Sequence, residues 1–383
     1  MLKAFKLRNY KNFKDEISIN FEDIAGYQFS TDCISDGILS KMIIYGRNAT
    51  GKTNLGNAIM DITKMLFQIG YKNEDIFINA DATEDFASFS YSFQFDNNEI
   101  IYRYTRFSNF DLRDEELIID GISIYKCSFY QDKYNFDNLK FINAETASIG
   151  RYLQSLDDGN ITEDVMEFKL PFLRWIINNT ALKNDSLLIK MSEFIRRMTM
   201  LKVSNTIMFG FSRFNDSFFE SLEAKDNLED FEQFLNTMGI KCKLVLKKLP
   251  DGQRELYFSH DKLIPFYKNA SSGTLALTNL YRRFVSTLRS SSFVYLDEFD
   301  AFYHYEMAEN VIKFFKRNYP KCQIIMTSHN TNLMTNRLMR PDCLFILSSS
   351  GTLTALCNAT LRELREGHNL EKMYIAGEFE KYE

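Results

Sequence analysis

Apolar and polar residues alternate along several segments in the first third of the chain, and this period of two predicts antiparallel strands. In one segment aromatic side chains occupy every second position, with serine or glutamine between them: Phe89, Tyr91, Phe93 and Phe95. The turn residues 96–98 follow, and the apolar run 101–104 returns as the second strand of a hairpin. Asp120-Gly121 predicts the turn of another hairpin. The pattern therefore indicates an antiparallel β layer.

Two other patterns mark buried strands and helices. Short apolar runs at 42–45, 293–296, 324–326 and 344–347 are typical of strands that are covered on both faces. After the first run, apolar residues recur at the helical spacing i, i+4, i+7 and i+11: Leu55, Ile59, Ile62 and Leu66. Helices are also expected near 228–238 and 307–315. The chain therefore reads as an α/β protein.

The patterns divide the 383 residues into three parts. Residues 1–145 combine the first buried run with the antiparallel layer. Residues 146–260 are mainly helical and end in a hairpin, in which 242–246 and 255–258 flank the turn Pro250-Asp251-Gly252. Residues 261–383 hold the remaining buried runs. Because no segment has the composition of a linker, we expect one composite head with a mainly helical insertion at 146–260.

The residues after the first buried run form a complete phosphate-binding loop: Gly46, Arg47, Asn48, Ala49, Thr50, Gly51, Lys52 and Thr53. The glycines let successive backbone N–H groups converge on a phosphate. Lys52 brings a positive charge to the β- and γ-phosphate oxygens, and the Thr53 hydroxyl can ligate Mg²⁺. Strand, loop and helix follow in the order that this Walker A motif needs. We therefore predict that the chain binds ATP together with Mg²⁺.

A second group of candidate residues follows two of the later buried runs. Asp297 and Glu298 end the run at 293–296, as in a Walker B motif. Asp297 is predicted to hold Mg²⁺, directly or through water, and Glu298 to polarise the attacking water. The run at 324–326 leads to His329, near the edge of a parallel sheet at which ligands bind. His329 is therefore a candidate γ-phosphate sensor.

Composition limits the other functions that the chain can have. Lysine and arginine number 46 and aspartate and glutamate 51, so a net charge of −5 argues against a nucleic-acid-binding field over the whole surface. Six cysteines are scattered without a CxxC pair, which predicts neither a zinc site nor a disulfide framework. No apolar signal segment or membrane-length run is present, so we expect a cytoplasmic protein with no membrane contact.

Together these motifs resemble the RecF/SMC-like ABC ATPases of prokaryotic antiphage defence, the type seen in PARIS, Septu, abortive-infection and overcoming-lysogenization-defect systems. The resemblance also rests on the opening 7–13, the segment Ser271-Ser272-Gly273-Thr274, the continuation 299–304 and the ending 370–377. By itself the serine-glycine segment is only a capped helix start. The resemblance implies an ABC-type P-loop ATPase head with a mixed sheet, an antiparallel β lobe and a helical insertion.

The resemblance also implies how the site is assembled. In the family two heads bind ATP face to face, and the signature of one head caps the γ-phosphate held by the other. Ser272 and Gly273 would accordingly act in trans within a homodimer, or within a larger homo-oligomer. Thr274 stands where transporter-type signatures have a second glycine. Asn143 and Gln154 are candidates for the glutamine-loop residue, and Tyr10 or Phe13 for stacking on the adenine, with a core role as the alternative.

Three functions are compatible with such a head. The first is an ATP-driven sensor, responsive to a phage trigger, that controls a separately encoded effector nuclease of the TOPRIM or HNH type by family analogy. Residues 146–260 and the helix-like segment 360–371 are the predicted docking surfaces for that partner. The second is a DNA-repair or recombination ATPase that clamps DNA. The third, a transporter subunit, is disfavoured by the opening and by the signature. The roughly 35 residues after the last predicted strand are too few for a nuclease domain.

Overall fold

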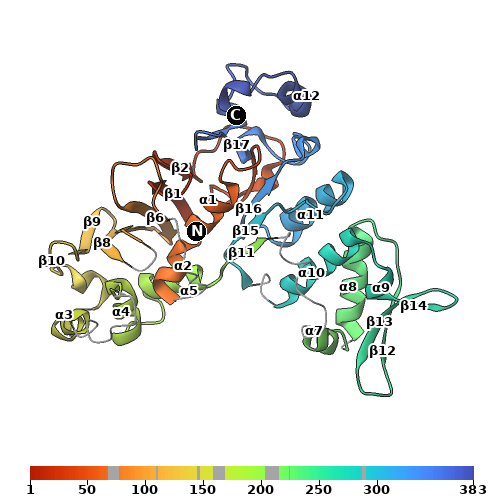
Figure 1. The fold of residues 1–383 in the computed structure, drawn as a ribbon, viewed down its shortest axis with the longest axis horizontal. Helices are drawn as coiled ribbons and strands as arrows, with labels where there is room; N and C mark the ends of the chain where they lie inside the picture. The colour runs from red at the N-terminus through yellow and green to blue at the C-terminus, as the bar shows by residue number, and fades with distance from the viewer. Residues whose placement is uncertain are drawn as a thin grey trace.

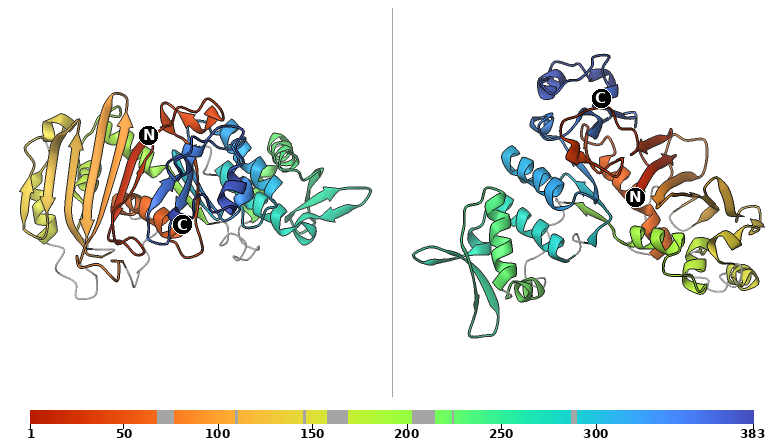
Figure 2. Two further views of the ribbon diagram at one scale, coloured as in Figure 1. Left: turned by 90° about the horizontal axis from the view of Figure 1, so that it is seen from above. Right: turned by 180° about the vertical axis from the view of Figure 1, so that it is seen from behind.

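Two sheets of different architecture form the body of the protein, for which a computed structural model describes residues 1–67, 77–108, 111–144, 147–157, 169–202, 215–223, 225–286 and 290–383. Figure 1 shows the arrangement, and Figure 2 shows it from above and from behind. A smaller sheet and its helices extend from the body at residues 215–286. The predicted boundary at residues 145 and 146 lies outside the described residues.

The first sheet is antiparallel and has seven strands, as the alternating pattern predicts. Phe89, Tyr91 and Phe93 of β6 are buried, whereas Phe95 at the end of the strand and the serines between the aromatic residues are half-buried. In sheet order the strands are β10 (Lys133–Asn135), β9 (Ile122–Ser128), β8 (Leu112–Ile119), β7 (Asn98–Arg106), β6 (Ala87–Phe95), β1 (Leu2–Arg8) and β2 (Ile17–Asn20).

The second sheet has six strands and is parallel except for its last strand, β18. Every residue of β5, β15, β16 and β17 is buried, which explains the apolar runs at their centres. In sheet order the strands are β11 (Met198–Lys202), β15 (Phe293–Asp297), β16 (Gln323–Ser328), β5 (Lys41–Tyr45), β17 (Leu344–Leu347) and β18 (Leu353–Ala355).

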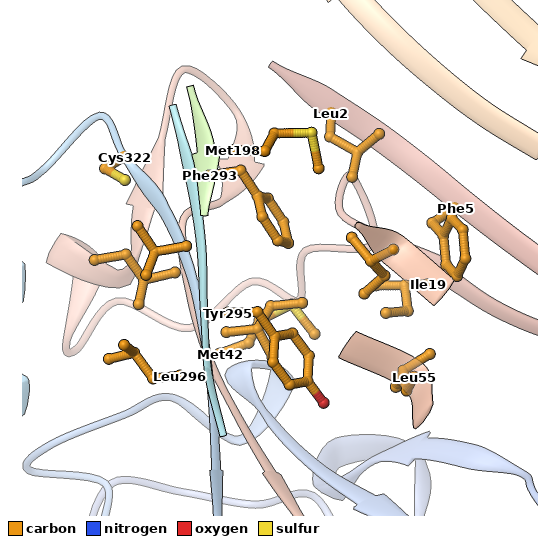
Figure 3. Close-up of a cluster of buried hydrophobic side chains, with 14 of the residues drawn as sticks. Leu2, Phe5, Ile19, Met42, Leu55, Met198, Phe293, Tyr295, Leu296 and Cys322 are labelled. Atoms are coloured by element: carbon orange, nitrogen blue, oxygen red, sulfur yellow. The ribbon is translucent and has the colours of Figure 1, made fainter. Parts of the chain in front are cut away.

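Helices cover both faces of this central sheet. Figure 3 shows Tyr295 and Leu296 on opposite sides of β15, with Tyr295 directed towards Leu55 of α1 (Lys52–Ile59). The Tyr295 hydroxyl donates to the Lys52 carbonyl at 2.5 Å. A Cβ atom on Gly56 would lie 2.5 Å from the Tyr295 ring, so only glycine permits this approach of helix and strand. Helix α2 (Asp61–Phe67) continues α1, and α11 (Tyr305–Asn318) leads from β15 to β16.

The two sheets are joined through a shared core and through one side chain. The Gln323 side chain accepts from the Leu2 backbone N–H and donates to the Leu2 carbonyl, both at 2.8 Å. Figure 3 shows Leu2, Phe5 and Phe293 directed into the space between the sheets. The first strand of the chain is thereby fixed to the central sheet.

Three helices of the predicted insertion pack near the antiparallel sheet: α3 (Ile149–Asp157), α4 (Phe172–Asn179) and α5 (Leu187–Arg196). The start of α4 is tied to the sheet by Glu115, which is buried on β8. Its carboxylate accepts from the Phe172 and Leu173 N–H groups at 2.7 and 2.9 Å. Burial raises the pKa of Glu115, and these hydrogen bonds oppose that rise.

The predicted insertion also contains a strand that the sequence pattern did not reveal. Residues 198–202 form β11, which pairs in parallel with β15 in the central sheet. Only Met198 of this strand is fully buried, because β11 lies at the edge of the sheet. A short, half-buried strand carries little periodic signal.

The extension contains the predicted hairpin, which is confirmed. The remaining elements there are α7 (Asn215–Leu222), α8 (Lys225–Thr237), β12 (Leu244–Lys248), β13 (Arg254–Ser259), β14 (Leu263–Pro265), α9 (Phe266–Asn269) and α10 (Ser272–Ser286). Gly239 follows α8 at φ 96°, a left-handed conformation that ends the helix. Elsewhere, β3 (Ile34–Ser35) pairs with β4 (Ile38–Leu39), and α12 (Leu370–Ile375) lies near the end of the chain. None of the helices in the described ranges has the length and apolarity of a membrane span.

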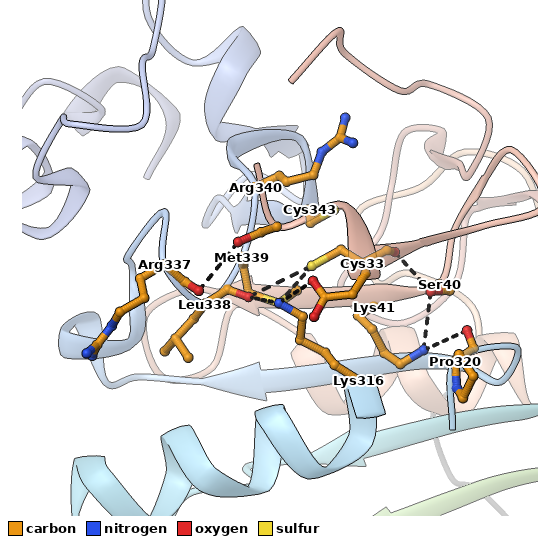
Figure 4. A network of polar contacts seen from close by, with 12 residues as sticks. Cys33, Ser40, Lys41, Lys316, Pro320, Arg337, Leu338, Met339, Arg340 and Cys343 are labelled. Atoms are coloured by element: carbon orange, nitrogen blue, oxygen red, sulfur yellow. Dashed lines mark hydrogen bonds and ion pairs between the residues drawn. The ribbon is translucent and has the colours of Figure 1, made fainter. Parts of the chain in front are cut away.

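A buried lysine, Lys41, begins strand β5 of the central sheet. Lys41 is fully buried, and its ammonium group donates to the Ser40 hydroxyl and to the Pro320 and Cys322 carbonyls at 2.9–3.2 Å. Figure 4 shows this group beside Lys316, which donates to the Leu338 carbonyl. Burial lowers the pKa of Lys41 to about 8.

This lowered pKa predicts a specific dependence of stability on pH. The folded chain releases the Lys41 proton near pH 8, whereas the unfolded chain keeps it up to the ordinary pKa of 10.5. The free energy of unfolding should therefore rise between these pH values, by about 3 kcal/mol from this group alone. Urea unfolding at pH 7 and pH 10 measures the rise. The variant Lys41→Met should lack it, and an equal rise in both proteins would contradict the assignment.

Candidate functional site

The phosphate-binding loop connects β5 to α1, as predicted. Gly51 has φ 100°, which is left-handed and favours glycine. A Cβ atom on Gly46 would lie 2.8 Å from the Leu347 carbonyl oxygen and 2.9 Å from the Thr50 hydroxyl. Both glycines are therefore required by the backbone path, and the other predicted residues of the loop, Arg47, Asn48 and Ala49, lie between them.

Lys52 is folded back over this loop. Its ammonium group donates to the Gly46 and Arg47 carbonyls at 2.8 and 2.9 Å, and the residue is buried. Burial lowers the pKa of Lys52, and the nearby Asp297 and Glu298 carboxylates oppose the shift. The charge is therefore held above the loop, where phosphate oxygens would replace the carbonyls as acceptors.

The Walker A helix and the Walker B strand meet at a direct hydrogen bond. The Thr53 hydroxyl donates to Asp297 Oδ2 at 2.7 Å. Asp297 is 5% exposed, so its carboxylate is held within the site. A hydroxyl and a carboxylate are the hard oxygen ligands that Mg²⁺ prefers. The two residues that the sequence analysis assigned to Mg²⁺ are therefore in contact, and their chemistry fits the ion that the motif implies.

Glu298 and His329 lie at the same edge. Glu298 has φ 51°, so the chain turns sharply after β15. His329 follows β16, in which Ser328 pairs with Tyr45 at the end of β5. The pKa of His329 is lowered by burial and by the charge of Lys52, against the opposing effects of Glu298 and of a hydrogen bond with the Gly46 backbone. These neighbours place the His329 imidazole beside the phosphate-binding loop, where the side chain is exposed.

Ser272 and Gly273 are positioned differently. They begin α10, and the Ser271 hydroxyl accepts from the Thr274 N–H at 3.1 Å as the helix cap. A Cβ atom on Gly273 would lie 3.0 Å from the Phe302 carbonyl oxygen, which follows the Walker B strand. Figures 1 and 2 show α10 beside α8, on the far side of β15 and β16 from α1. The chain does not bring its own signature residues to its own phosphate-binding loop.

Most of the chain matches a known protein family. Residues 41–335, more than half of the chain, match the family model described as "AAA domain, putative AbiEii toxin, Type IV TA system". The chain belongs to this family. The predicted α/β fold, with a mixed sheet beside an antiparallel β lobe, is confirmed. No curated protein matches the chain.

Several solved structures of Smc heads are similar to this AAA-domain protein at low identity. One is the SmcHead bound to the C-winged helix domain of ScpA, with 15% identity, TM-score 0.45, and coverage of 90% of this chain and 93% of that chain. The SMC head domain from Thermotoga maritima has 15% identity, TM-score 0.44, and coverage of 92% and 98%. The Smc head domain with an extended coiled coil, bound to the C-terminal domain of ScpA derived from Pyrococcus furiosus, has 14% identity, TM-score 0.46, and coverage of 99% of both chains.

Four further candidates do not line the site as binding groups. Tyr10 and Phe13 are each 1% exposed, so the core role holds for both rings. Phe13 packs beneath the loop, where its ring would meet a Cβ atom on Gly51 at 3.1 Å. Asn143 follows a turn that contacts β9, and Gln154 lies on α3. Figure 1 shows α3 at the β10 end of the antiparallel sheet, away from α1.

An ion pair that sequence reasoning missed reaches the phosphate-binding loop. The Arg47 guanidinium donates to Glu383 Oε2 through Nη2 at 2.8 Å and through Nε at 3.2 Å. The Arg47 side chain is 71% exposed and that of Glu383 14%. The two residues are 336 positions apart, so no local pattern could have revealed the pair.

We expect Glu383→Gln to strengthen nucleotide binding modestly. The substitution removes the negative charge beside the loop and leaves Arg47 available to phosphate oxygens. Because exposed ion pairs contribute little, the affinity for a fluorescent ATP analogue should rise about two- to fivefold. Glu366→Gln, at an exposed glutamate in the same terminal part of the chain, is the matched control. Equal affinities in all three proteins would show that the pair does not compete with the nucleotide.

Proposed function

We propose that this chain binds ATP with Mg²⁺ and hydrolyses it to ADP and phosphate in sites shared by two copies. The observation that carries the proposal is the 2.7 Å contact between Thr53 and Asp297, which joins Walker A to Walker B. Lys52, Glu298 and His329 lie around that contact. A purely structural hydrogen bond would not need a phosphate-binding loop, an acidic residue with a left-handed backbone and a histidine at one sheet edge.

Each of these residues has a distinct part in the proposed reaction. Mg²⁺ held by Thr53 and Asp297 would neutralise charge on the β- and γ-phosphates. Lys52 would transfer its hydrogen bonds from the loop carbonyls to phosphate oxygens. Glu298 would accept a proton from the attacking water, and an N–H group of His329 would donate a hydrogen bond to the γ-phosphate. Positioning and charge therefore account for catalysis without a covalent intermediate.

The position of α10 supports a shared site. Ser272 and Gly273 begin a helix on the far side of the central sheet from α1, and in the proposed arrangement a second copy would supply them to the nucleotide. A homodimer closed by two ATP molecules satisfies this requirement with the same surface on both partners. A larger homo-oligomer could be built from such dimers.

Mixing two inactive variants tests the shared site. Lys52→Ala disables the loop of one copy, and Ser272→Arg blocks the signature of the other. Each homodimer should be inactive, whereas the heterodimer rebuilds one working site out of two. A 1:1 mixture should therefore recover up to about a quarter of the wild-type ATPase rate, because half of the dimers are mixed and each has one site. An inactive mixture, with heterodimers present by native mass spectrometry, would contradict sharing.

We further propose that this ATPase serves prokaryotic antiphage defence by controlling a separately encoded effector, a nuclease of TOPRIM or HNH type. The family description names a putative toxin of a type IV toxin–antitoxin system, which is consistent with a defence role. In the described ranges no group of three or more His, Cys, Asp or Glu side chains could hold a metal ion, so these ranges offer no nuclease centre. The effector would dock on residues 146–260 or 360–371, and Leu361 in the second segment is exposed.

Expression in cells challenged with phage tests this role. Protection should require the neighbouring gene for the effector and an intact Glu298. Protection by the chain alone would contradict the division of labour. If the purified protein instead binds DNA in an ATP- and salt-dependent manner and gives no protection, the alternative of a DNA-clamping repair ATPase is favoured.

A further inference from the structure

One buried hydroxyl group connects the two acidic residues of the candidate site. Thr327, the fifth residue of β16, is fully buried and lies beside the end of β15. Its Oγ1 donates to Asp297 Oδ1 at 3.0 Å and accepts from the Glu298 backbone N–H at 2.7 Å. An ionised carboxylate can only accept, and a backbone N–H can only donate, so the direction of both hydrogen bonds is fixed. The Thr327 hydroxyl group therefore acts at once as the donor to Asp297 and as the acceptor for Glu298.

The first of these bonds sets the orientation of the Asp297 carboxylate. Thr53 binds Oδ2 at 2.7 Å, and Thr327 binds Oδ1. With one hydroxyl on each oxygen, the carboxylate cannot rotate without losing a hydrogen bond in a site that is nearly closed to water. Oδ2 is consequently presented to Thr53, the other residue that fits the metal ion.

The second bond holds the unusual backbone of Glu298. A residue with a side chain seldom adopts φ 51°, and such a conformation persists where its surroundings fix it. Thr327 fixes this backbone with two hydrogen bonds. Its hydroxyl accepts from the Glu298 N–H, and its carbonyl oxygen accepts from the Phe299 N–H at 3.2 Å. The turn after β15 is thus tied to β16 on both sides of Glu298.

We propose that Thr327 is a positioning residue for ATP hydrolysis, which sets the metal carboxylate of Asp297 and the backbone of Glu298 with one hydroxyl group. This inference rests on the proposed ATPase function. Thr327 lies below the phosphate-binding loop and acts through its two neighbours. It therefore affects the metal requirement and the turnover rate, while contacts between the loop and the nucleotide stay intact.

Three substitutions separate positioning from packing. Thr327→Val keeps the shape and removes the hydroxyl, Thr327→Ser keeps the hydroxyl and removes a methyl group, and Ser328→Ala removes an adjacent buried hydroxyl that donates to Asp300 instead. Since each lost bond involves a charged or strained partner, kcat of the valine variant should fall about 10- to 100-fold. The serine variant should stay within about threefold of wild type, because its hydroxyl can make both bonds.

A second readout does not depend on turnover. Binding of a fluorescent ATP analogue in the presence of EDTA should be unchanged in Thr327→Val, because Lys52 and the loop are intact. Adding Mg²⁺ should then enhance binding of the analogue in the wild type and in the serine variant. The valine variant should need at least about fivefold more Mg²⁺ for the same enhancement. Equal Mg²⁺ requirements in valine variant and wild type, or equal defects in the valine and serine variants, would overturn the proposal.

The two readouts also distinguish the outcomes. If wild type binds ATP with Mg²⁺ but does not hydrolyse it, the proposed function fails, while the Mg²⁺ titration still decides the role of Thr327. If Thr327→Val does not fold, as judged by thermal unfolding, Thr327→Cys provides the test with a side chain of similar size and a weaker donor. It should show an intermediate Mg²⁺ requirement, and a wild-type requirement would overturn the proposal.

Discussion

Replacing Lys52 with alanine is expected to remove nucleotide affinity and ATP turnover together. The ammonium group already bridges the Gly46 and Arg47 carbonyls, so it is poised above the loop without any ligand. Its hydrogen bonds to phosphate oxygens are charge-assisted and shielded from water, and their loss should weaken ATP binding about 10- to 100-fold. Turnover should fall below detection, because the same charge stabilises the transferred phosphoryl group.

Isothermal titration with ATP and a phosphate-release assay measure the two effects. Lys64→Ala is a suitable control, because this lysine lies on the adjoining helix α2 and outside the loop. Thermal unfolding should show that Lys52→Ala remains folded, since its two carbonyl partners can be satisfied by water at the partly open loop. Normal hydrolysis by the alanine variant would mean that the Walker A assignment is wrong.

The catalytic edge of the central sheet could be predicted from the sequence because each of its parts leaves a local signal. Strands β5, β15 and β16 are covered on both faces, so they appear as short apolar runs. Loop residues with special backbone requirements, such as Gly46 and Gly51, appear as glycines. Since carboxyl ends of parallel strands share one edge, the order of these signals along the chain was enough to bring Lys52, Asp297 and His329 together.

Contacts between distant segments left no such signal. The edge strand β11 is half-buried, and its pairing with β15 depends on residues almost 100 positions away. The hydroxyl of Thr327 is one of many in the chain, and only the register of β15 with β16 shows that it faces Asp297. The ion pair of Arg47 and Glu383 likewise could not be predicted from a periodic pattern in the sequence.

The end of the chain shows how local side-chain bonds override a helical pattern. Residues 360–371 were expected to be helix-like, whereas the structure places a helix only at α12, from Leu370. Asn369 caps that helix by accepting from the Lys372 N–H at 2.8 Å. Before it, the His368 ring accepts from the Arg365 N–H and closes a turn. The helix therefore starts where its cap lies, about ten residues after Thr360.

Glu298→Gln is expected to separate ATP binding from ATP cleavage. The amide keeps the size of the side chain, and the backbone at φ 51° remains tied to Thr327 through its N–H. Lys52, Thr53 and Asp297 are unchanged, so affinity for ATP with Mg²⁺ should stay within about twofold of wild type. Loss of the group that accepts the water proton should lower kcat about 10²- to 10⁴-fold.

A variant that binds ATP without cleaving it should also accumulate the closed dimer. Signature residues Ser272 and Gly273 of one copy would remain on the γ-phosphate held by the other, because hydrolysis no longer releases them. Light scattering coupled to size exclusion should therefore show that Glu298→Gln is a dimer with ATP and a monomer with ADP. As the control, Glu306→Gln changes an exposed glutamate on α11 and should behave as wild type. If the glutamine variant hydrolyses ATP at the wild-type rate, another group activates the water. If it binds ATP and stays monomeric, the capped face-to-face dimer is wrong, and the role of α10 has to be sought in contacts with a different partner.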